Sequence, residues 1–543
     1  MNLIKPNHNF NVERSKISHM KKLTTLLVIL ATQVFSQVPN YLVTKNNNAP
    51  KGYYMFAPIK FTQNNSGQFL LDSEGDLVYY RDFPTMRTYD FKRHANGKIS
   101  YFDSFHNYFI VMDSLFNNID TVSTVGYYTD VHDLIILPNG NYMIMGVETT
   151  IEDLSAYHMF KHHQAPGSTT AKRQAAVIQE LDSTNTIVFQ WHANTHFPFD
   201  SADPFWLNDS DIVDWTHSNA LEPDTDGNIL MSSRHFDEIT KIDRRTGAVL
   251  WRFGGKYNQF TFIGDTTRFY GQHDVRRLKN GHITLFDNGN HFTPHPARAC
   301  EYELDEEAMT AKLVWSYIYD SLMYSNAMGN VQRIPNHQTL VNYGAINTNS
   351  VCFNVVDSLG QEVFNISFPT GLYSYRSFYY PGMPWAVHQP TVTCFDSLGV
   401  MYLKAQSGLS NYRWNTGSQS QIIPVTSTGN YVVNVPDGAN AYVFSDPIVV
   451  NDIAKFCNLT GLSKLEKNLN IRIYPNPANN MLFISFENNT HYTVKILDVS
   501  GKELKVPMTE NTLKNETQFD VSELNSGLYF VQINNQMTKF IKE

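Results

Sequence analysis

The segment HDVRRLKNGHITLFDNG, residues 273–289, decides the fold that we predict for this chain. Two short runs in which apolar and polar residues alternate flank the turn residues Asn280 and Gly281. An Asn-Gly pair between alternating runs is a strong signal for a β-hairpin. The segment is therefore predicted to form two antiparallel strands joined by a tight turn.

The same succession of strand, turn and strand recurs along the chain. The further copies are APKGYYMFAP (49–58, degenerate), DFKRHANGKISYF (90–102), HDLIILPNGNYMIMG (132–146), NALEPDTDGNILMSS (219–233) and NVQRIPNHQTLVNYG (330–344). A second hairpin with an aspartate before its turn, as in TKIDRRTGAVLWRF (240–253), alternates strictly with the first. Repeats of this kind indicate an array of similar structural units.

Two consecutive hairpins make a four-stranded sheet, and the sequence contains six such pairs. Radial packing of six sheets buries both faces of each, which is the arrangement of a β-propeller. We therefore predict an all-β chain with a six-bladed β-propeller at residues 38–384. The aromatic content of 13% agrees with strands rather than helices. The net charge of −9, without a basic block, argues against nucleic acid as a partner.

The N-terminal region has the features of an export signal. From Met20 the chain reads MKKLTTLLVILATQVFSQ, with two lysines, a short apolar run and small residues around Ser36. We predict a signal peptide at residues 1–36, with translation starting at Met20. The apolar run is too short to span a bilayer, and no transmembrane segment is expected. The cysteines lack the close pairs of a zinc site, and an exported chain can form one or two disulfides from Cys300, Cys352, Cys394 and Cys457.

Equivalent positions in the hairpins hold residues suited to chemistry. The position seven residues before the turn holds Tyr89, His132, Asn219, His273 and Gly329. Because the first strand of each propeller blade lines the central channel, these residues are expected to converge at one mouth of it. His217 precedes Asn219 by two residues and should share its face. A single histidine in such a place is usually structural, whereas several that converge indicate a site.

The charges near the predicted cluster favour an anion over a metal ion. Arg234, at the end of the second strand of its hairpin, adds a fixed positive charge near His217. A guanidinium opposes a bound cation but offers a planar donor fork to an oxyanion. Asp133 and Asp274 follow their histidines directly, and alternation should turn them to the opposite face, where they hold blades together. We expect no metal and no cofactor.

Three segments resemble the bacterial arylsulfotransferase family, which comprises exported enzymes that move a sulfuryl group between phenols without a nucleotide sulfate donor. They are VHDLIILPNGNYMIMG (131–146), DWTHSNALEPDTDGNILMSSR (214–234) and HDVRRLKNGHITLFDNGN (273–290). The resemblance covers about residues 40–380. It implies phenolic sulfates and phenols as substrates, with no metal and no cofactor.

The resemblance also assigns roles to the clustered residues. It implies that His273 is the nucleophile and is transiently sulfurylated, and that Arg234 and Asn219 bind the sulfuryl oxygens. His132 or His217 would act as general acid and base, and His132 could also bind the sulfuryl group. Sulfuryl transfer spreads charge over equatorial oxygens, so positioning and charge stabilisation are the main tasks of the protein.

Other residues receive lesser roles. Three histidines of an insertion are assigned to a solvated lid: His158, His162 and His163. His192 and His196 have helical ligand spacing in a segment that reads as strand and loop, so we interpret them as structural. Residues that could contact substrate near the mouth are His291, His295 and Arg298. Aromatic residues that could stack on a phenol are Tyr157, Phe197, Phe199, Phe205 and Trp206.

The C-terminal third contains two further predicted parts. Residues 388–457 resemble a small immunoglobulin-like module, bracketed by Cys394 and Cys457, which we interpret as a spacer. A polar linker follows at 458–470. Residues 471–543, with the motifs YPNP and LNSGLYF, resemble the β-sandwich sorting domain that the type IX secretion machinery reads and that is removed on export. We therefore expect a protein that is secreted or held at the cell surface after passing through the periplasm.

Three other functions remain open from the sequence. The chain could be a sulfate-ester hydrolase, which differs only in passing the sulfuryl group to water. It could be a non-catalytic propeller that binds sulfated glycans, in which case removal of His273 would leave binding intact. A metalloenzyme would require bound metal and sensitivity to chelators.

Overall fold

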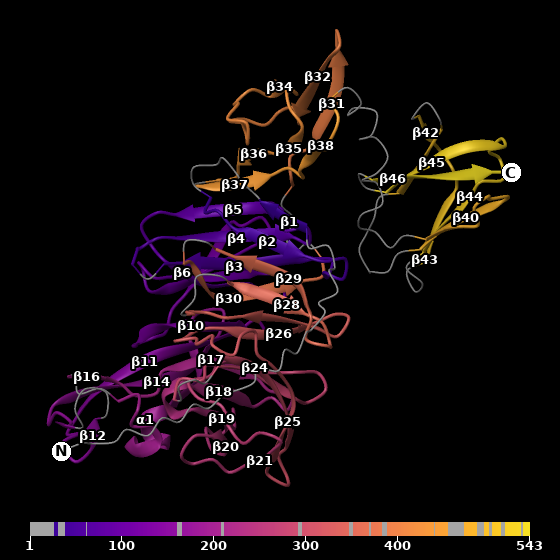
Figure 1. Ribbon diagram of the computed structural model, residues 1–543. Coiled ribbons are helices and arrows are strands. Elements are labelled where there is room, and N and C mark those ends of the chain that lie inside the picture. Colours follow the sequence, from indigo (N-terminus) through magenta and orange to yellow (C-terminus); the bar gives the residue numbers. More distant parts are fainter. Residues whose placement is uncertain are drawn as a thin grey trace, which may run out of the picture. The chain divides into compact units, whose positions relative to one another are not determined.

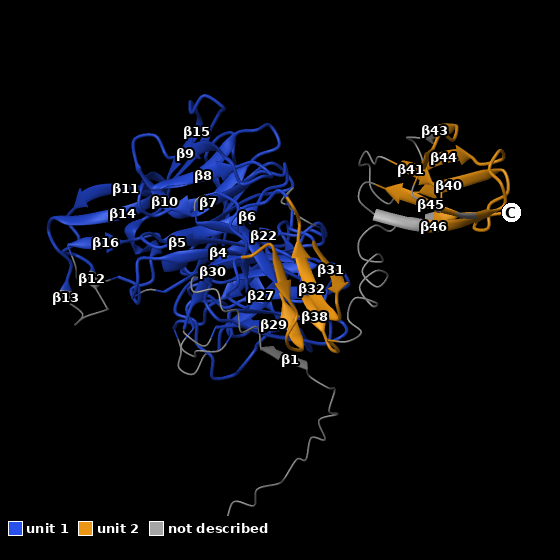
Figure 2. Cartoon of the chain, turned by 90° about the horizontal axis from the view of Figure 1, so that it is seen from above, with its two compact units in different colours: residues 1–391, 408–419, 432–447 blue, residues 392–407, 420–431, 448–543 orange. Residues whose placement is uncertain are grey.

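The computed structural model describes residues 27–30, 38–60, 62–159, 165–207, 211–291, 296–346, 351–368, 371–382, 388–438, 440–453, 472–485, 494–498, 502–511, 516–533 and 536–543. These residues are almost entirely strands and turns, so the predicted all-β class is confirmed. The chain forms two compact units, coloured separately in Figure 2. The first unit comprises residues 1–391, 408–419 and 432–447, and the second comprises 392–407, 420–431 and 448–543.

Six sheets, each with a four-stranded antiparallel part, make up most of the first unit, and we number them blades 1 to 6 (Figure 1). Blade 1 consists of β30 (Tyr373–Tyr380), β3 (Tyr53–Ile59), β4 (Ser66–Asp72) and β5 (Leu77–Phe83). Blade 2 consists of β6 (Thr88–Arg93), β7 (Ile99–Asp103), β8 (Tyr108–Met112) and β9 (Asn118–Val122). Blade 3 consists of β10 (Tyr128–Ile136), β11 (Tyr142–Glu152), β14 (Ala171–Leu181) and β15 (Ile187–His192), with β16 (Ile212–Asp214) beside β14.

Blades 4 to 6 repeat this plan. Blade 4 consists of β17 (Ser218–Pro223), β18 (Ile229–Ser233), β19 (Glu238–Ile242) and β20 (Val249–Gly254). Blade 5 consists of β22 (His273–Arg277), β23 (Ile283–Asp287), β24 (Arg298–Asp305) and β25 (Thr310–Tyr317), with β21 (Thr261–Ile263) beside β25. Blade 6 consists of β26 (Asn330–Ile334), β27 (Gln338–Asn342), β28 (Phe353–Val356) and β29 (Glu362–Ser367), extended by β2 (Leu42–Lys45) and β1 (Leu27–Leu30).

Short elements lie in the connections within and between blades 3 and 4. They are α1 (Ala193–His196), the 3-10 helices η1 (Phe199–Ser201) and η2 (Arg234–Phe236), and the two-residue strands β12 (His158–Met159) and β13 (Ala165–Pro166). No helix among the described residues is long and apolar enough to cross a membrane. Of the predicted signal peptide, only β1 is described, and its other residues lie outside the described part of the chain.

The innermost strands of the six blades contact one another in a closed ring. β6 contacts β10, followed by β17, β22, β26 and β30, and β30 returns to β6. Closure joins the two ends of the propeller, because β30 is paired with β3, with Tyr53 opposite Tyr380. Residues 49–58 therefore supply a single strand and not the degenerate hairpin that we predicted, since the inner strand of blade 1 comes from residues 373–380. The six-bladed propeller itself is confirmed.

Aromatic side chains of blades 6 and 1 pack against each other where the two blades meet. Tyr54 of β3 stacks on Phe364 of β29 with ring centroids 4.3 Å apart. Phe56 packs edge-on against Phe353 at 5.2 Å, and both rings are fully buried. Each buried aromatic side chain removes a large apolar area from water, so this contact stabilises the closed ring.

Irregular pairing at the start of the inner strands sets which side chains reach the channel. The register shifts between Tyr89 and Lys92, between Thr129 and Leu134, between Ser218 and Ala220, and between His273 and Arg276. Such β-bulges redirect side chains. Strict alternation is therefore a poor guide to side-chain direction at these positions.

Three aspartates at equivalent positions of the inner strands, Asp90, Asp133 and Asp274, contact one guanidinium. The buried side chain of Arg376 on β30 lies 2.8 Å from Asp90, 3.3 Å from Asp133 and 2.8 Å from Asp274. Arg276 adds further ion pairs to Asp133 and Asp274, at 2.9 and 2.7 Å. The aspartates thus join blades 2, 3 and 5 to blade 1, which confirms the predicted role of Asp133 and Asp274 in holding blades together.

The sheet of blade 1 continues into the C-terminal part of the chain. β5 pairs with β37 (Ala441–Phe444), which is followed in the sheet by β36 (Val433–Pro436) and β33 (Arg413–Trp414). These strands belong to the first unit. The predicted immunoglobulin-like module, 388–457, is therefore divided between the two units.

The second unit contains the remaining strands. A three-stranded sheet is formed by β31 (Val392–Ser397), β32 (Val400–Ala405) and β34 (Ile422–Pro424), and a pair by β35 (Gly429–Tyr431) and β38 (Ile448–Val450). The predicted linker at 458–470 lies outside the described residues.

Two four-stranded sheets follow near the C-terminus. One consists of β39 (Arg472–Tyr474), β40 (Met481–Ser485), β44 (Glu516–Asp520) and β43 (Met508–Asn511). The other consists of β42 (Glu503–Leu504), β41 (Val494–Leu497), β45 (Gly527–Ile533) and β46 (Gln536–Lys542). Leu482, Phe519, Val531 and Phe540 from both sheets share one buried cluster, as in a β-sandwich.

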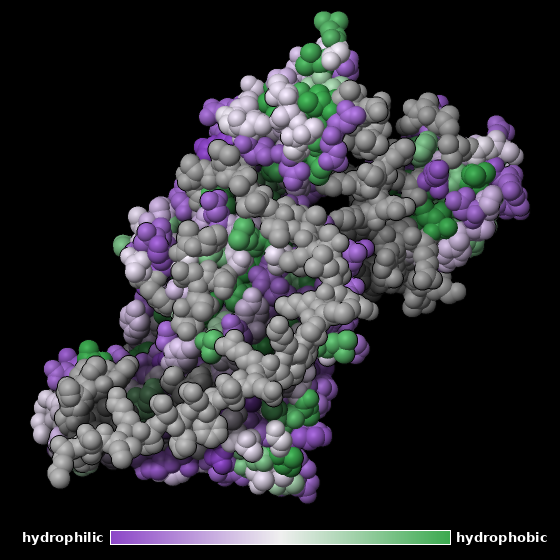
Figure 3. Space-filling view, in the orientation of Figure 1, coloured by the Kyte–Doolittle hydropathy of each residue, from purple (hydrophilic) through white to green (hydrophobic). Residues whose placement is uncertain are grey.

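Apolar and polar residues are interspersed on the face of the molecule shown in Figure 3. Exposed apolar side chains such as Ile151 and Leu359 are far apart in sequence and lie in different blades. Scattered exposed apolar residues are normal for soluble surfaces.

Candidate functional site

The predicted site residues lie at the start of the inner strands of blades 3, 4 and 5. His132 lies on β10, Asn219 on β17 and His273 on β22, and His217 immediately precedes β17. Arg234 opens η2, directly after β18. Neighbouring blades whose inner strands contact one another therefore supply these residues.

His132 and His217 form a pair in which both imidazoles are bound to carboxylates. Their ring centroids lie 5.2 Å apart. His132 Nδ1 lies 2.5 Å from Asp130, and His217 Nδ1 lies 2.5 Å from Asp214. A carboxylate at Nδ1 orients the ring, leaves Nε2 for a substrate and stabilises the imidazolium form. Both rings are therefore equipped to carry protons.

The backbone around this pair is partly held in the left-handed region. His217 has φ +42° and Asp237 has φ +52°. Residues other than glycine rarely adopt such angles, which cost about 1–3 kcal/mol each and cluster at functional sites. The surrounding sheets therefore impose the direction of these side chains.

A third histidine, His235, completes a row of rings and was missed by sequence reasoning. Its centroid lies 4.6 Å from that of His217, and its ring stacks on Trp206 at 5.1 Å. Its Nδ1 donates to the carbonyl oxygen of Asp214 at 2.6 Å. Burial and then the neighbouring His217 hold the pKa of His235 well below its usual value, so this ring is neutral. The only signal in the sequence is its position beside Arg234.

Arg234 is held over an aromatic ring and points its donors at two neighbours. Its guanidinium carbon lies 4.1 Å from the Trp206 ring centroid. Nη1 donates to His235 Nε2 at 3.1 Å, and Nη2 donates to the carbonyl oxygen of Asn326 at 2.7 Å. Burial lowers the pKa of Arg234 to about 10, which leaves it cationic at neutral pH. Its buried Nε has no hydrogen-bond partner among the described residues.

Asn219 is fully buried and ties blade 4 to its neighbours. Its Nδ2 donates to the carbonyl oxygen of Gln272 at 2.7 Å, and its own carbonyl oxygen accepts from Arg376 at 2.8 Å. The side-chain Oδ1 has no partner within the described part of the chain. Asn219 is thus a structural bridge with one unused acceptor.

The environment of His273 fixes its tautomer. Nδ1 lies 3.0 Å from the carbonyl oxygen of Gly271 and 2.8 Å from Asn288 Oδ1, while Nε2 lies 3.1 Å from the backbone nitrogen of Met328. A carbonyl can only accept and a backbone N–H can only donate. Nδ1 therefore carries the proton, and Nε2 carries the lone pair.

The same environment keeps His273 neutral. The side chain is buried, with the residue 2% exposed. Burial, followed by the charges of Arg234 and His217, holds the pKa of His273 well below its usual value. A neutral imidazole becomes a nucleophile at Nε2 once the Met328 N–H no longer occupies that lone pair.

A cavity of about 220 Å³ adjoins the two carboxylate-bound histidines. One wall carries His132, His217, Asp130 and Asp214, and the lining also includes the apolar side chains of Met145, Val147, Ala175 and Ala176. His273 and Arg234 do not line it. Engineered apolar cavities of about 150 Å³ bind benzene, so this space is large enough for one aromatic ring.

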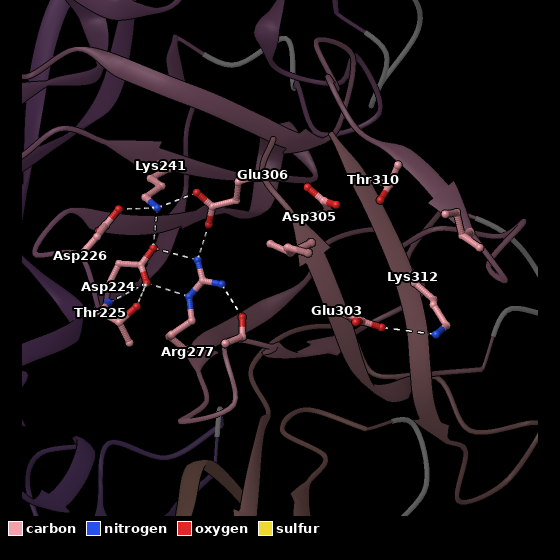
Figure 4. Close-up of a pocket in the computed structure, with 13 residues that line it drawn as sticks. Asp224, Thr225, Asp226, Lys241, Arg277, Glu303, Asp305, Glu306, Thr310 and Lys312 are labelled. Carbon is pink, nitrogen blue, oxygen red and sulfur yellow. Dashed lines mark hydrogen bonds and ion pairs between the residues drawn. The ribbon is translucent and has the colours of Figure 1, made fainter. Parts of the chain in front are cut away.

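A larger cavity, about 740 Å³, lies at the other end of the strands (Figure 4). β22 begins at His273 and ends at Arg277, which lines this cavity. Arg277 is paired with Asp224 at 2.7 Å, and Lys241 with Asp224 at 2.9 Å and Glu306 at 2.7 Å. These charges neutralise one another, so the larger cavity is held together by structural ion pairs.

Two residues predicted at the mouth have structural roles. Arg298 is buried in ion pairs with Asp287 and Asp265 at 2.8 and 2.9 Å, so it does not face substrate as we predicted. Its position two strands from the axis in blade 5 explains this. His291 stacks on Tyr270 at 4.5 Å and lies 3.1 Å from Asp237. His295 lies outside the described residues.

Other candidates make structural contacts or lie outside the described residues. Residues 193–196 form α1 rather than strand and loop, and His196 stacks on Trp191 at 4.6 Å, which is a structural contact. Phe197 and Phe199 are buried in the core between blades 3 and 4. The structure describes neither His162 and His163 nor the side chain of His158.

Two clusters of side chains bring potential metal ligands together. Asp214, His217 and His235 form one, and Asp203, Asp237 and His291 form the other, each with its ligand atoms within 4.8 Å of one another. In the first cluster Arg234 already donates to His235 Nε2, and its charge opposes a bound cation. In the second cluster His291 Nδ1 lies 3.9 Å from Asp203 and Nε2 lies 3.1 Å from Asp237, so the two carboxylates face different ring nitrogens.

Comparisons with solved structures return chains of low sequence identity. A protein of unknown function from Bacteroides caccae shares 10% identity, with a TM-score of 0.38, over 60% of this chain and 98% of that chain. A catalytically inactive variant of virginiamycin B lyase from Staphylococcus aureus, solved with quinupristin, shares 7% identity, with a TM-score of 0.32, over 68% of this chain and 97% of that chain. A protein from Lactobacillus plantarum shares 10% identity, with a TM-score of 0.34, over 73% of this chain and 100% of that chain. No curated protein matches the chain.

Two family models match the sequence. The model for secretion system C-terminal sorting domains matches residues 472–543, which indicates export to the cell surface or beyond. The model for arylsulfotransferases (ASST) matches residues 30–376, which include the whole cluster of His132, His217, Arg234 and His273. With this match extending over more than half of its length, the chain belongs to the arylsulfotransferase family.

Proposed function

We propose that the protein is an exported enzyme that transfers a sulfuryl group from a phenolic sulfate ester to a phenolic acceptor through a sulfohistidine at His273. Family membership supports sulfuryl transfer, and the sorting domain supports export by the type IX secretion machinery. The observation that carries the mechanism is the difference among the histidines. His273 is neutral with its lone pair on Nε2, whereas His132 and His217 are bound to carboxylates.

In the first half-reaction His273 Nε2 attacks sulfur. The N–S bond forms as the S–O bond to the aryl group breaks, and the phenolate leaves with the electron pair of that bond. His132 or His217 donates a proton to the leaving oxygen, since both have a carboxylate that stabilises the protonated ring. The acceptor phenol then gives its proton to the same ring and attacks sulfur, which restores neutral His273.

Arg234 is suited to stabilise the charge that spreads over the sulfuryl oxygens. Its guanidinium is fixed on Trp206, and its Nε is unpaired within the described residues. Preorganised donors of this kind contribute more in a buried site than in water. A planar fork matches two oxygens of a tetrahedral anion.

The segment from Asn326 to Met328 must move away from His273 and Arg234 before the sulfuryl group can be transferred. It places the Asn326 carbonyl on Arg234 and the Met328 N–H on the lone pair of His273. Displacement of this segment by a sulfuryl group would free both catalytic groups together. The Met328 N–H would then lie beside a sulfuryl oxygen and could donate to it.

Mass analysis of the enzyme after exposure to an aryl sulfate tests this function. At alkaline pH, where phosphoramidate-like bonds survive, the peptide that contains His273 should carry one sulfuryl group, and His273→Ala should abolish both adduct and turnover. His282, on the turn of the same hairpin and bound to Glu301, supplies the matched control, His282→Ala, which should retain both. Turnover unchanged in His273→Ala, without an adduct, would exclude the mechanism. Product analysis with and without a phenol separates transferase from hydrolase.

A further inference from the structure

A closed ring of hydrogen bonds surrounds the imidazole of His273. Asn288 Oδ1 accepts from His273 Nδ1 at 2.8 Å, and Asn288 Nδ2 donates to the Met328 carbonyl oxygen at 3.0 Å. Met328 N–H returns to His273 Nε2 at 3.1 Å. A second donation from Asn288 Nδ2 reaches Ser325 Oγ at 2.9 Å. One carboxamide thus contacts both the imidazole and the backbone segment that covers it.

The side-chain amide of Asn288 can adopt only one of its two orientations in this environment. Asn288 and Ser325 are completely buried. The Met328 carbonyl oxygen can only accept, so the amide nitrogen must face it and the amide oxygen must face His273. Asn288 lies directly after β23, and His273 opens β22, so both residues of this hydrogen bond belong to blade 5.

The charge of the group at Nδ1 distinguishes His273 from the other two histidines. His132 and His217 have an aspartate there, whereas His273 has a neutral amide and a backbone carbonyl. A carboxylate favours the imidazolium far more strongly than a neutral acceptor does. The neighbouring carboxylates are otherwise occupied, because Asp287 binds Arg298 at 2.8 Å and Asp274 binds Arg376 at 2.8 Å.

We propose that Asn288 is the positioning residue that fixes the Nδ1–H tautomer of His273, with the lone pair at Nε2, without adding the negative charge with which a carboxylate at the same place would favour the imidazolium. The inference rests on the proposed function, in which this nitrogen attacks sulfur. Three charged or titratable groups act on the ring from other elements: Arg234 of η2, His217 before β17 and His132 of β10. All three lower the pKa of His273, in the same direction as burial, whereas the hydrogen bond to Asn288 raises it and is outweighed.

Asn288→Asp is the most direct variant, because it preserves shape while placing a carboxylate on Nδ1. An adjacent opposite charge raises a histidine pKa by about 1–3 units. The pH below which kcat/KM falls, the acid limb of the profile, should therefore rise by about one unit or more. At a pH below this limb, kcat/KM should fall about tenfold or more relative to the wild type. Asn288→Ala, which removes the contact without adding charge, should lower kcat without moving the limb upward.

Asn290 is the matched control. It lies in the same turn, and its Nδ2 donates to the Ser325 carbonyl oxygen and to Tyr324 Oη, both at 2.9 Å. It anchors the same segment without a hydrogen bond to His273. Asn290→Asp reports the effect of a nearby charge, and Asn290→Ala reports the effect of a weaker anchor for the segment at Ser325. Neither variant should shift the acid limb to higher pH by a unit.

A measurement without substrate separates this inference from the proposed function. Nitrogen NMR of ring-labelled histidines, assigned by the loss of one signal in His273→Gln, reports tautomer and protonation. His273 should remain neutral and protonated at Nδ1 from pH 7.5 to pH 5.5, and should titrate at higher pH in Asn288→Asp but not in Asn290→Asp. A His273 that titrates near pH 6.5 in the wild type, or is unchanged in Asn288→Asp, overturns the role of Asn288. If the ring behaves as expected and no sulfuryl transfer occurs, the role of Asn288 is upheld and the proposed function fails.

Discussion

Among the histidines of the site, His132, His217 and His273 have different partners at Nδ1. Aspartates hold His132 and His217, whereas His273 faces Asn288 and a backbone carbonyl. The first two rings are suited to exchange protons, and the third is suited to attack sulfur. The division of labour therefore depends on single carboxylate or carboxamide groups and not on the histidines themselves.

Arg234→Lys tests whether the guanidinium acts as a planar donor. Lysine keeps the positive charge but is a point donor, and it loses the stacking on Trp206. We expect kcat to fall about a hundredfold, as for loss of one oxyanion donor. Steady-state kinetics with an aryl sulfate and a phenol measure the change. A fall of less than about twofold would show that Arg234 contributes charge alone.

The sequence located most of these residues but not their partners. His132, Asn219 and His273 occupy equivalent positions before a hairpin turn, so alignment of the repeats finds them. His235 was missed because a strand reading places it on the face opposite Arg234, while η2 turns both residues toward the same site. Asn288 was missed because it lies in a turn, where the sequence pattern gives no direction for a side chain.

The element that covers the site is the segment before β26. Met328 and Gly329 have φ +68° and φ +106°, and a Cβ on Gly329 would lie 2.4 Å from the ring of Phe286. This tight contact sets where the Met328 N–H meets His273. The conformation of one short connection thus decides whether the lone pair of His273 is covered.

Gly329→Ala should disturb this segment. The added methyl group meets Phe286 in a conformation that is already unfavourable for alanine, so we expect the free energy of unfolding to fall by about 2–4 kcal/mol and turnover to fall with it. Gly281→Ala is the control, because φ is +87° there and nothing lies within 4 Å. It should cost only about 1 kcal/mol and leave turnover intact. Equal losses for both variants in denaturant unfolding would show that Phe286 is not in contact.

Element prediction succeeded where the repeats are regular. Asn-Gly turns such as Asn280 and Gly281 fixed the hairpins, because their backbone requirements are local. The inner strand of blade 1 was not assigned, since its pairing with β3 joins residues about 320 positions apart and leaves no local signal. The bulges beside His132 and His273 were missed for a related reason, because pairing partners determine them.

At the scale of the whole propeller, Arg376 joins three blades through Asp90, Asp133 and Asp274. Removing one partner of a buried ion pair leaves uncompensated charge. Arg376→Met should therefore lower the free energy of unfolding by about 3–5 kcal/mol. Lys312→Ala, which breaks an exposed pair with Glu303, should cost less than about 1 kcal/mol. Denaturant unfolding of both variants measures the two losses. Similar losses would show that Arg376 contributes no more to stability than an exposed ion pair.

Stability should fall as the pH falls below about 6.5. Burial holds the pKa values of His94, His235 and His273 well below their usual value, with the charge of Lys92 adding to the effect at His94. Below pH 6.5 the unfolded chain therefore binds protons that the folded chain excludes, and each ring costs up to about 1.4 kcal/mol per pH unit.

His94→Gln isolates one of these three contributions. His94 bonds Ser100 Oγ at 2.7 Å on blade 2. The variant should lose less stability than the wild type between pH 7.5 and pH 5, whatever its stability at pH 7.5. If the free energies of unfolding of the two proteins change equally with pH in denaturant experiments, His94 has an ordinary pKa in the folded chain.

The domain plan follows from the sequence only in part. The propeller and the C-terminal sorting domain have recurrent motifs, and their family models match residues 30–376 and 472–543. The immunoglobulin-like module between them stays a prediction, and within its range β37 extends the sheet of blade 1 through pairing with β5. Backbone pairing between distant strands carries no signature in side-chain pattern, so this boundary could not be predicted.

The central claim is that the neutral His273 becomes a covalent carrier of the sulfuryl group. Rapid-quench analysis of the wild-type enzyme mixed with an aryl sulfate, followed by alkaline digestion and mass analysis, measures that intermediate over time. The account predicts a sulfuryl group on His273 that forms at least as fast as turnover and disappears when a phenol is added. Turnover without any adduct on His273, or an adduct that persists in the presence of phenol, would contradict it.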